Sequence, residues 1–357
     1  MRRAIELAQK GAGRTSPNPM VGAVVVKGGK AVGEGYHAKA GRPHAEIGAL
    51  KKAGRRARGA SLYLNLEPCC HFGRTPPCTD AILAAGVAKV FVGMRDPNPL
   101  VAGRGIRILQ KAGVRVQTGI LREECERLNE VFVKYIRSRT PFVVLKAAIS
   151  LDGKIATAAG ESRWISGAAS RKIVHELRDR VDAVLVGAGT VLKDDPLLTA
   201  RLGRRKGKNP VRIVLDNRNL VPLNSRVFYN ADTQRVIYVS TGQLPEERES
   251  ELRRMGVEIC PAPEKDGKVD LRQLLRNLGE MELTSVLIEG GSEVNASAIE
   301  AKVVDKIMLF AAPVVIGGRG APGAVGGEGI ESLRDAHPVK RLTVRRVGKD
   351  FLLEGYL

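Results

Sequence analysis

The stretch EPCCHFGRTPPC at residues 67–78, together with the earlier stretch PHAE that contains His44 and Glu46, decides how the first part of the chain folds. His44 and Glu46 are expected in the first turn of one helix, so both side chains can face the same cavity. Cys69 and Cys78 add two thiolates. Because zinc prefers imidazole and thiolate ligands in a tetrahedral arrangement, we predict that His44, Cys69 and Cys78 bind Zn²⁺.

Three protein ligands leave the fourth zinc position open to water, which is typical of a catalytic site. Zinc lowers the pKa of such a water to about 7, and we predict that Glu46 carries protons between the water and a leaving amine. An H-x-E motif followed by P-C is typical of zinc-dependent nucleobase deaminases, although their usual form is P-C-x-x-C. Here residue 72 is Phe, and Cys78 follows Cys69 by nine residues.

A closed structural zinc site is the alternative. Its four ligands would be Cys69, Cys70, His71 and Cys78. This site leaves His44 and Glu46 without a role, and adjacent ligands at 69 and 70 would strain the tetrahedron.

The length of 357 residues suggests two domains, at about 150 residues per domain. The net charge of +20 favours anionic partners, either nucleic acid or phosphorylated small molecules, although an evenly basic surface explains it equally well. The longest apolar runs are far shorter than the roughly 20 residues that a membrane span needs. The N-terminus lacks the apolar core of a secretory signal, so we expect a cytoplasmic protein without a membrane partner.

Helices and strands are expected to alternate along the first 140 residues, which indicates a three-layer α/β domain. The expected strands are 21–26, 31–35, 62–66, 89–93 and 114–118, and the expected helices are 5–10, 44–53, 79–85, 106–112 and 121–137. The segment Ser138–Pro141 breaks the last helix, and we place a domain boundary there, with domains 1–140 and 141–357.

The second part of the chain alternates in the same way. Its expected strands are 142–148, 183–187, 211–215, 235–239, 257–260, 285–288 and 306–315. Its expected helices are 168–180, 245–255, 271–278 and 293–301, and a final hairpin is expected over 341–347 and 351–357.

Two glycine patterns of the second part compete as a binding site for a dinucleotide phosphate. The segment Gly318–Gly323 reads G-x-G-x-x-G, but it contains a proline and is followed by too little chain for the βαβ unit of a Rossmann fold. The segment Ile288–Ser292 instead leads from a strand into a helix, where backbone N–H groups can bind phosphate. Gly187–Thr190 is expected to be a second loop that lets a ligand approach the backbone closely.

The chain also resembles the family of bifunctional riboflavin-biosynthesis deaminase/reductases, from Ile5 to its C-terminus. In the first part the resemblance depends on PNPMVGAVVV (17–26), GYHAKAGRPHAE (35–46), EPCCHFGRTPPC (67–78) and MRDPNP (94–99). In the second part it depends on LKAAISLDGKIA (145–156), GESRWIS (160–166), DDPLLTAR (194–201) and LIEGG (287–291). The long separation of the two ligand cysteines is characteristic of this family among deaminases.

The resemblance implies an N-terminal cytidine-deaminase-like three-layer α/β/α domain and a C-terminal dihydrofolate-reductase-like α/β domain. The first domain would hydrolyse the 2-amino group of 2,5-diamino-6-(5-phosphoribosylamino)pyrimidin-4(3H)-one, giving 5-amino-6-(5-phosphoribosylamino)uracil and ammonia. The second would use NADPH to reduce the ribosyl group of this product to ribityl. The implied partners are therefore phosphoribosylated aminopyrimidines and not nucleic acid, and the resemblance implies a homo-oligomer.

The resemblance also implies the contact residues. For the deaminase substrate these are Asn18, His37 and Ala45 around the pyrimidine, and Arg74, Asp96 and Asn98 beside the ribose phosphate. For the reductase substrate they are Lys146, Ser162, Arg178, Leu197, Arg201 and Glu289. For NADPH they are Ala148, Trp164, Thr190, Asp194, Gly291, Ser292, Glu293, Val294, Asn295, Ala296 and Ser297.

Simpler roles compete at several of these positions. Asn18 and Asn98 lie beside prolines, where asparagine commonly forms turns. Trp164 could be a core residue, although its neighbours are polar, and Asp152 is expected only to shape the turn at Gly153. The proton donor of the reduction is left open among Lys146, Glu289 and water.

Two other functions compete with that of the bifunctional enzyme. A tRNA or cytidine deaminase with an appended domain would suit the basic charge, but the long cysteine separation and the reductase-like motifs disfavour it. A zinc-stabilised binding protein without turnover would not need Glu46, so its function would survive Glu46→Ala.

Overall fold

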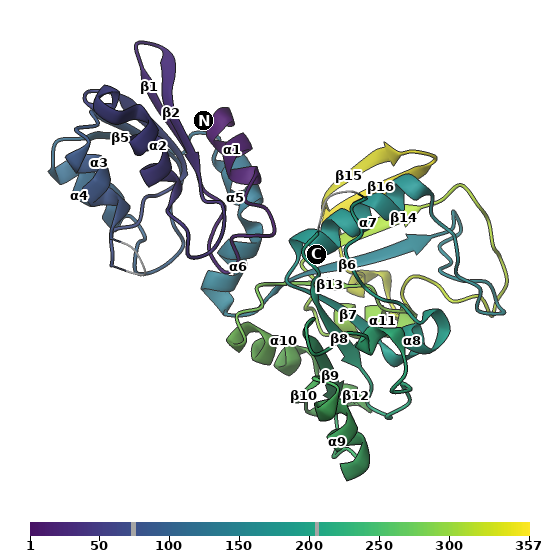
Figure 1. Cartoon of the computed structure of the whole chain (residues 1–357). Helices are drawn as coiled ribbons and strands as arrows, with labels where there is room; N and C mark the ends of the chain where they lie inside the picture. Colours follow the sequence, from purple (N-terminus) through teal and green to yellow (C-terminus); the bar gives the residue numbers. More distant parts are fainter. Residues whose placement is uncertain (73–75, 204–206) are drawn as a thin grey trace. The chain divides into compact units, whose positions relative to one another are not determined.

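The computed structural model describes residues 1–72, 76–203 and 207–357. The chain divides into two compact units, Met1–Arg139 and Thr140–Leu357 (Figure 1). The boundary that we expected after residue 140 lies one residue from this division. No helix in the described ranges is long and apolar enough to cross a membrane.

Unit 1 contains a sheet of five strands in the order β2-β1-β3-β4-β5. The strands are β1 (Gly22–Lys27), β2 (Lys30–Tyr36), β3 (Ser61–Leu66), β4 (Lys89–Met94) and β5 (Arg115–Thr118). Strand β1 pairs antiparallel with β2 and with β3, whereas β3, β4 and β5 are mutually parallel. The turn between β1 and β2 needs two residues with positive φ, and Gly28 and Gly29 supply them at 57° and 75°.

Helices cover both faces of this sheet. They are α1 (Arg2–Gln9), α2 (Ala45–Ala53), α3 (Cys78–Ala84), α4 (Arg104–Lys111), α5 (Arg122–Leu128) and α6 (Glu130–Ser138), with a 3-10 turn at Gly54–Ala57. Val25 faces the core under α2, and its neighbour Val24 faces α1, as alternation along a strand requires. The expected three-layer arrangement is therefore confirmed.

The expectation of one helix over 121–137 is wrong, because two helices, α5 and α6, meet at Asn129. This residue is buried and non-helical, with φ −106° and ψ 21°. Its side chain accepts a hydrogen bond from Met20 N at 2.8 Å and donates one to Met20 O at 3.0 Å. The break thus fixes the backbone that follows the Pro17–Pro19 turn.

Unit 2 contains a nine-stranded sheet in the order β10-β9-β8-β7-β13-β6-β14-β16-β15. Its strands are β6 (Phe142–Ile149), β7 (Ala183–Gly187), β8 (Val211–Leu215), β9 (Val236–Ser240), β10 (Glu258–Pro261), β13 (Ser285–Ile288), β14 (Lys306–Ala311), β15 (Lys340–Val347) and β16 (Asp350–Tyr356). The first seven in sheet order are parallel, and β16 and β15 are added antiparallel. A separate small hairpin joins β11 (Glu264–Lys265) and β12 (Lys268–Val269).

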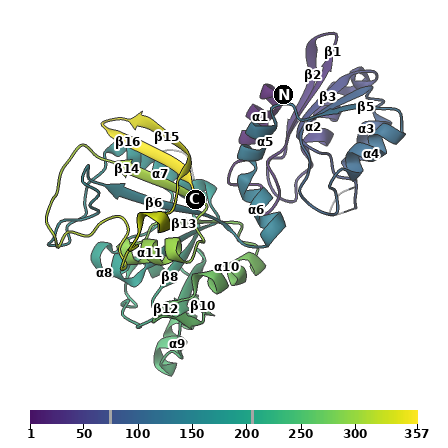
Figure 2. The same cartoon turned by 180° about the vertical axis from the view of Figure 1, so that it is seen from behind.

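The helices of unit 2 are α7 (Ala168–Arg180), α8 (Ala188–Asp194), α9 (Glu246–Arg254), α10 (Leu271–Glu280) and α11 (Ser292–Glu300), with 3-10 turns at Arg226–Phe228 and Leu333–Asp335. Leu274, Leu278 and Ala298 of α10 and α11 pack on one face of the sheet. Helix α7 crosses the front of the sheet in Figure 1, whereas α11 is in front in Figure 2. Because the central strands are parallel, their carboxyl ends meet at one edge, where ligands of open α/β sheets bind.

Two local expectations for unit 2 are wrong. The segment Gly187–Thr190 is not a loop, since Gly187 is the N-cap of α8 and Thr190 lies inside that helix. The strand expected over 306–315 ends at Ala311, because Pro313 has no N–H group with which to continue the ladder.

Candidate metal centre and candidate reductase site

Three segments of unit 1 bring His44, Cys69 and Cys78 together. His44 is the extended N-cap of α2, Cys78 is the first residue of α3, and Cys69 follows β3. His44 Nδ1 lies 3.2 Å from Cys78 Sγ and 3.5 Å from Cys69 Sγ. All three ligand atoms lie within 4.8 Å of one another, and within the described residues neither Cys70 nor His71 belongs to this group.

This donor set fits zinc. A tetrahedral zinc with Zn–S near 2.3 Å and Zn–N near 2.05 Å places a nitrogen and a sulfur ligand about 3.6 Å apart. One thiolate is favoured even without an ion, since the hydrogen bond from Cys78 lowers the pKa of Cys69 to about 4 although burial opposes this. The backbone N–H of Cys78 also donates to Cys69 Sγ, at 3.4 Å.

Glu46 lies in the first turn of α2, two residues after His44, and is only 3% exposed. Burial is the main cause that raises the pKa of its carboxyl, and a hydrogen bond with the Cys78 side chain acts in the opposite direction. The start of α2 packs against β2 at Gly35, where a Cβ atom would lie 2.2 Å from Ala45 O. The glycine therefore lets the helix place Glu46 beside the metal ligands.

His37 joins the metal centre to Asn18. Its Nδ1 lies 3.3 Å from Pro43 O, an acceptor, so Nδ1 carries the proton. Its Nε2 can then accept a hydrogen bond from Asn18 Nδ2, at 3.3 Å. The rings of His37 and His44 are nearly perpendicular, with centroids 5.5 Å apart. The structure thus brings together Asn18, His37 and His44, with Ala45 fully buried behind them.

Asp96 and Asn98 follow β4 and form successive side-chain turns. Asn98 N donates to Asp96 Oδ1 at 2.8 Å, and Leu100 N donates to Asn98 Oδ1 at 3.1 Å. Burial raises the pKa of Asp96 to about 6. The Oδ1 atom of Asn98 thus takes part in a turn, as the simpler role expected for this residue requires, while Arg74 lies outside the described residues.

Asn65 was missed by the sequence reasoning. It is fully buried in β3, accepts a hydrogen bond from Gly22 N at 2.8 Å and donates one to Met20 O at 2.9 Å. Together with Asn129 it fixes the backbone beside the turn that carries Asn18. An amide inside the apolar strand LYLNL was the available signal.

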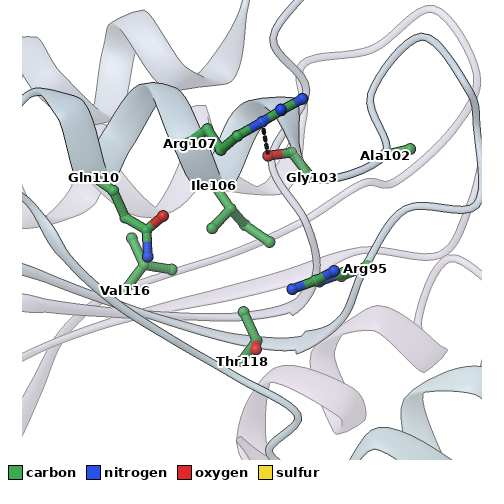
Figure 3. Close-up of a pocket in the computed structure, with 8 residues that line it drawn as sticks. All are labelled: Arg95, Ala102, Gly103, Ile106, Arg107, Gln110, Val116 and Thr118. Carbon is green, nitrogen blue, oxygen red and sulfur yellow. Dashed lines mark hydrogen bonds between the residues drawn. The ribbon is translucent and has the colours of Figure 1, made fainter.

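A separate hollow of about 350 Å³ lies between α4 and β5 (Figure 3). Its lining residues are Arg95, Ala102, Gly103, Ile106, Arg107, Gln110, Val116 and Thr118. None of the described residues that we predict for deamination lines this hollow. Arg107 Nε donates to Gly103 O at 3.3 Å within it.

In unit 2, Glu289 directly follows β13 and is bound by two cations. Arg178 of α7 donates to its two carboxylate oxygens at 2.6 and 3.1 Å, and Lys146 Nζ of β6 lies 3.5 Å from Oε2. Burial alone would raise the pKa of Glu289, but the charges of Arg178 and Lys146 lower it to about 2. The cluster is a buried, ionised site at the carboxyl edge of the parallel strands.

Arg201 and Leu197 lie in the segment that follows α8. Arg178 Nη1 donates to Thr199 O at 3.2 Å, and Arg201 Nη1 donates to Thr199 Oγ1 at 3.3 Å. Leu197 is half-buried in the same segment. Two of the guanidinium groups predicted to bind substrate therefore converge on Thr199.

A second group of predicted residues gathers around Asp194, the last residue of α8. Ser162 Oγ donates to Asp194 Oδ1 at 2.8 Å, and Arg163 binds the carbonyl oxygen of Asp194. Trp164 is 67% exposed, which excludes the core-packing alternative, and Arg171 stacks over its ring at 4.5 Å.

The predicted phosphate segment is the N-terminus of α11, with Gly291 as the extended N-cap. A Cβ atom at Gly291 would lie 3.8 Å from Thr190 Oγ1, so these two predicted NADPH contacts are neighbours. Asn295 and Ala296 are buried instead, and Asn295 Nδ2 donates to Ala324 O at 2.7 Å. The other predicted positions in this helix are Ser292, Glu293, Val294 and Ser297, while Ala148 lies in β6.

The three-layer fold and the His/Cys/Cys group define unit 1 as a zinc-binding deaminase domain. Residues 1–94 match the family described as the cytidine and deoxycytidylate deaminase zinc-binding region. Residues 141–353 match the RibD C-terminal domain. The chain belongs to the RibD family, and it is a bifunctional deaminase/reductase of riboflavin biosynthesis.

Similarity to relatives extends over the whole chain. The riboflavin biosynthesis proteins RibD of Actinobacillus pleuropneumoniae and Escherichia coli are 44% and 41% identical, over 99% of this chain and 93% and 97% of theirs. RibD of Acinetobacter baumannii (form 1) is 38% identical with a TM-score of 0.89, over 99% of this chain and 97% of that chain. The match of unit 2 contradicts the alternative of a tRNA or cytidine deaminase with an unrelated appended domain.

A crystal structure of a relative from Thermotoga maritima is named for two activities. It is described as a diaminohydroxyphosphoribosylaminopyrimidine deaminase/5-amino-6-(5-phosphoribosylamino)uracil reductase. It is 40% identical with a TM-score of 0.87, and the match covers 100% of this chain and 97% of that chain.

Proposed function

We propose that residues 1–140 deaminate 2,5-diamino-6-(5-phosphoribosylamino)pyrimidin-4(3H)-one and that residues 141–357 reduce the ribosyl group of the product with NADPH. The observation that carries this proposal is the convergence of His44, Cys69 and Cys78 beside the buried Glu46, in a chain whose second unit matches the RibD reductase domain. The name of the Thermotoga maritima relative gives that protein a diaminohydroxyphosphoribosylaminopyrimidine deaminase and a 5-amino-6-(5-phosphoribosylamino)uracil reductase activity.

In the proposed deamination His44, Cys69 and Cys78 would hold the zinc ion. When bound, zinc supplies an activated water at neutral pH. The Glu46 carboxyl takes a proton from the attacking water and delivers it to the departing amine, a task that suits a carboxyl whose pKa burial raises above its ordinary value. Asn18 and His37 orient the pyrimidine, while Asp96, Asn98 and Arg74 bind the ribose phosphate side.

In the proposed reduction NADPH supplies the hydride. Arg178, Arg201 and Lys146 give the phosphorylated substrate a cationic site, with Ser162, Leu197 and Glu289 completing it. The Glu289 carboxyl, with its pKa of about 2, is ionised at neutral pH and is not the proton donor. The donor is then Lys146 or water.

The cofactor would bind at the carboxyl edge of the sheet. We assign its pyrophosphate to the N-terminus of α11, where backbone N–H groups are available to an anion. Thr190, Asp194, Trp164 and Ala148 complete the proposed NADPH contacts. That the protein forms a homo-oligomer and that it is cytoplasmic are predictions from the sequence.

The decisive test is turnover of the diaminopyrimidine ribotide by the purified full chain, with ammonia release and NADPH oxidation measured separately. Glu46→Ala should abolish ammonia release while bound zinc and NADPH oxidation with the deaminated substrate persist. Glu124→Ala, which removes an exposed acid of α5, is the matched control. Near-complete deamination by the Glu46 variant refutes the proton transfer, and absence of NADPH oxidation by the unaltered chain refutes the reductase assignment.

A further inference from the structure

We propose that Glu67 is a positioning residue for deamination: its carboxylate sets the distance between the metal-ligand segment and the loop that carries Asp96 and Asn98. The inference rests on the proposed deaminase function. The sequence alone assigns no function to Glu67, which is only the first residue of the EPCC motif.

Glu67 is only 3% exposed, and its carboxylate accepts three hydrogen bonds from backbone N–H groups. Oε2 accepts from Asp96 N at 3.2 Å and from Gly103 N at 2.9 Å, and Oε1 accepts from Ile106 N at 3.2 Å. The donors span residues 96–106, so one side chain holds both ends of the loop.

The backbone of Glu67 continues directly into the metal site. Its own N–H donates to Met94 O at 3.0 Å, at the end of β4. Pro68 and the ligand Cys69 follow in the chain, and Cys69 O accepts from Thr79 N at 3.2 Å. A displacement of the Glu67 carboxylate therefore changes the position of Asp96 relative to the thiolates.

Gly105 provides a second contact between the same two segments. A Cβ atom at Gly105 would lie 2.2 Å from Pro68 O and 3.4 Å from Glu67 Oε1. The first turn of α4 thus packs directly against the backbone that precedes Cys69. Any side chain at residue 105 must push the two segments apart.

On its other side the loop is open. Ala102, Gly103 and Ile106 line the hollow between α4 and β5, which is about 350 Å³ in volume (Figure 3). Among the residues that the structure describes, no packed side chains fill that space, so the loop depends more strongly on its hydrogen bonds to Glu67 for its position.

A glutamine cannot replace this carboxylate. Both oxygens of Glu67 face backbone N–H donors, and an amide would turn its own NH₂ donor towards at least one of them. Glu67→Gln therefore loses hydrogen bonds on one side of the loop with almost no change in volume. The expected effect is on the binding of the ribose phosphate side of the substrate, because Asp96 and Asn98 move while the metal ligands stay.

The test compares full-length Glu67→Gln with the unaltered chain. We expect the KM of deamination to rise about tenfold or more, with a smaller change in kcat, full zinc content and unchanged kinetics of NADPH oxidation by the same molecule. Glu34→Gln is the matched control, because Glu34 is a partly exposed acid that pairs with Arg3 on the surface of the same unit. An unchanged KM refutes the proposal, and so does loss of zinc, which would place Glu67 in the support of the metal instead.

Two further measurements test the proposal. Hydrogen exchange does not depend on the identity of the substrate, and the KM of Gly105→Ala does not depend on how well Glu67→Gln folds. Hydrogen exchange at the amides of Asp96, Gly103 and Ile106 should be faster in Glu67→Gln than in the unaltered chain, whereas the amides of unit 2 should keep their rates. If the three amides exchange as slowly in the variant as in the unaltered chain, the proposal is refuted. Gly105→Ala should reproduce the rise in KM with zinc retained, and a wild-type KM in that variant also refutes it. Failure of the unaltered chain to release ammonia refutes the deaminase function, whatever the exchange rates.

Discussion

Replacing Glu289 by glutamine removes the negative charge that Arg178 and Lys146 share while it keeps the shape of the side chain. The side chains of these three residues are 8%, 13% and 16% exposed, so solvent screens the lost interaction poorly. The pKa of Glu289 falls from an ordinary value of 4.5 to about 2 on folding. This difference of about 2.5 corresponds to about 3 kcal/mol of stability in unit 2 at neutral pH.

The dependence on pH has a defined sign. A carboxyl whose pKa is depressed by folding stabilises the protein fully above its unfolded pKa, and this contribution disappears as the pH falls through the folded pKa. The difference in stability between the unaltered chain and Glu289→Gln should therefore be full above about pH 5 and should close between about pH 4.5 and pH 2.

The assay measures urea denaturation of each variant by hydrogen exchange. Peptides from β13 and α7 report the unfolding of unit 2, and peptides from β1 and β3 in unit 1 are the internal reference. Glu258→Gln is the matched control, because Arg235 binds Glu258 at 2.7 and 2.8 Å but both side chains are well exposed. Such an exposed pair contributes about 0.2–1 kcal/mol. A loss in Glu289→Gln no larger than that in the control, or a loss independent of pH, refutes the reasoning.

Three further outcomes are expected. Cys78→Ser should lose zinc by metal analysis whereas Cys70→Ser should keep it; retention in the first variant would contradict the three-ligand site. Gly35→Ala should lower kcat for ammonia release with normal NADPH oxidation, because its Cβ would lie 2.2 Å from a carbonyl oxygen of α2; a wild-type kcat would show that the helix start does not matter. Asp152→Asn should speed proteolysis within residues 314–323, because its carboxylate accepts two backbone hydrogen bonds from there at 3.0 and 2.7 Å; unchanged cleavage would count against this anchor.

The elements of both sheets were largely predictable, because their signals are local. Alternation in Leu62, Leu64 and Leu66 and the glycine pair between β1 and β2 need no distant partner to be interpreted. The break at Asn129 could not be foreseen, because it depends on hydrogen bonds to Met20, which lies 109 residues away in the chain. Residue 129 on its own is compatible with a continuous helix.

The candidate site also has a part that the sequence predicts and a part that it does not. His44, Glu46 and the cysteines have a spacing whose chemistry is visible in the sequence. The roles of Glu67 and Asn65 depend on which backbone amides meet their side chains, and no local pattern contains that information. In unit 2 the ion cluster at Glu289 could be predicted only through the resemblance, since Glu289 lies 111 residues from Arg178 and 143 residues from Lys146 in the chain.

Trp164 is the sole tryptophan of the chain, and it lies exposed under Arg171 in unit 2. Indole emission from this protein therefore has a single origin, and it needs no label or engineered probe. A nicotinamide cofactor that binds beside Trp164 would quench that emission. Binding of the cofactor to unit 2 can thus be titrated by fluorescence alone, in the intact two-domain chain.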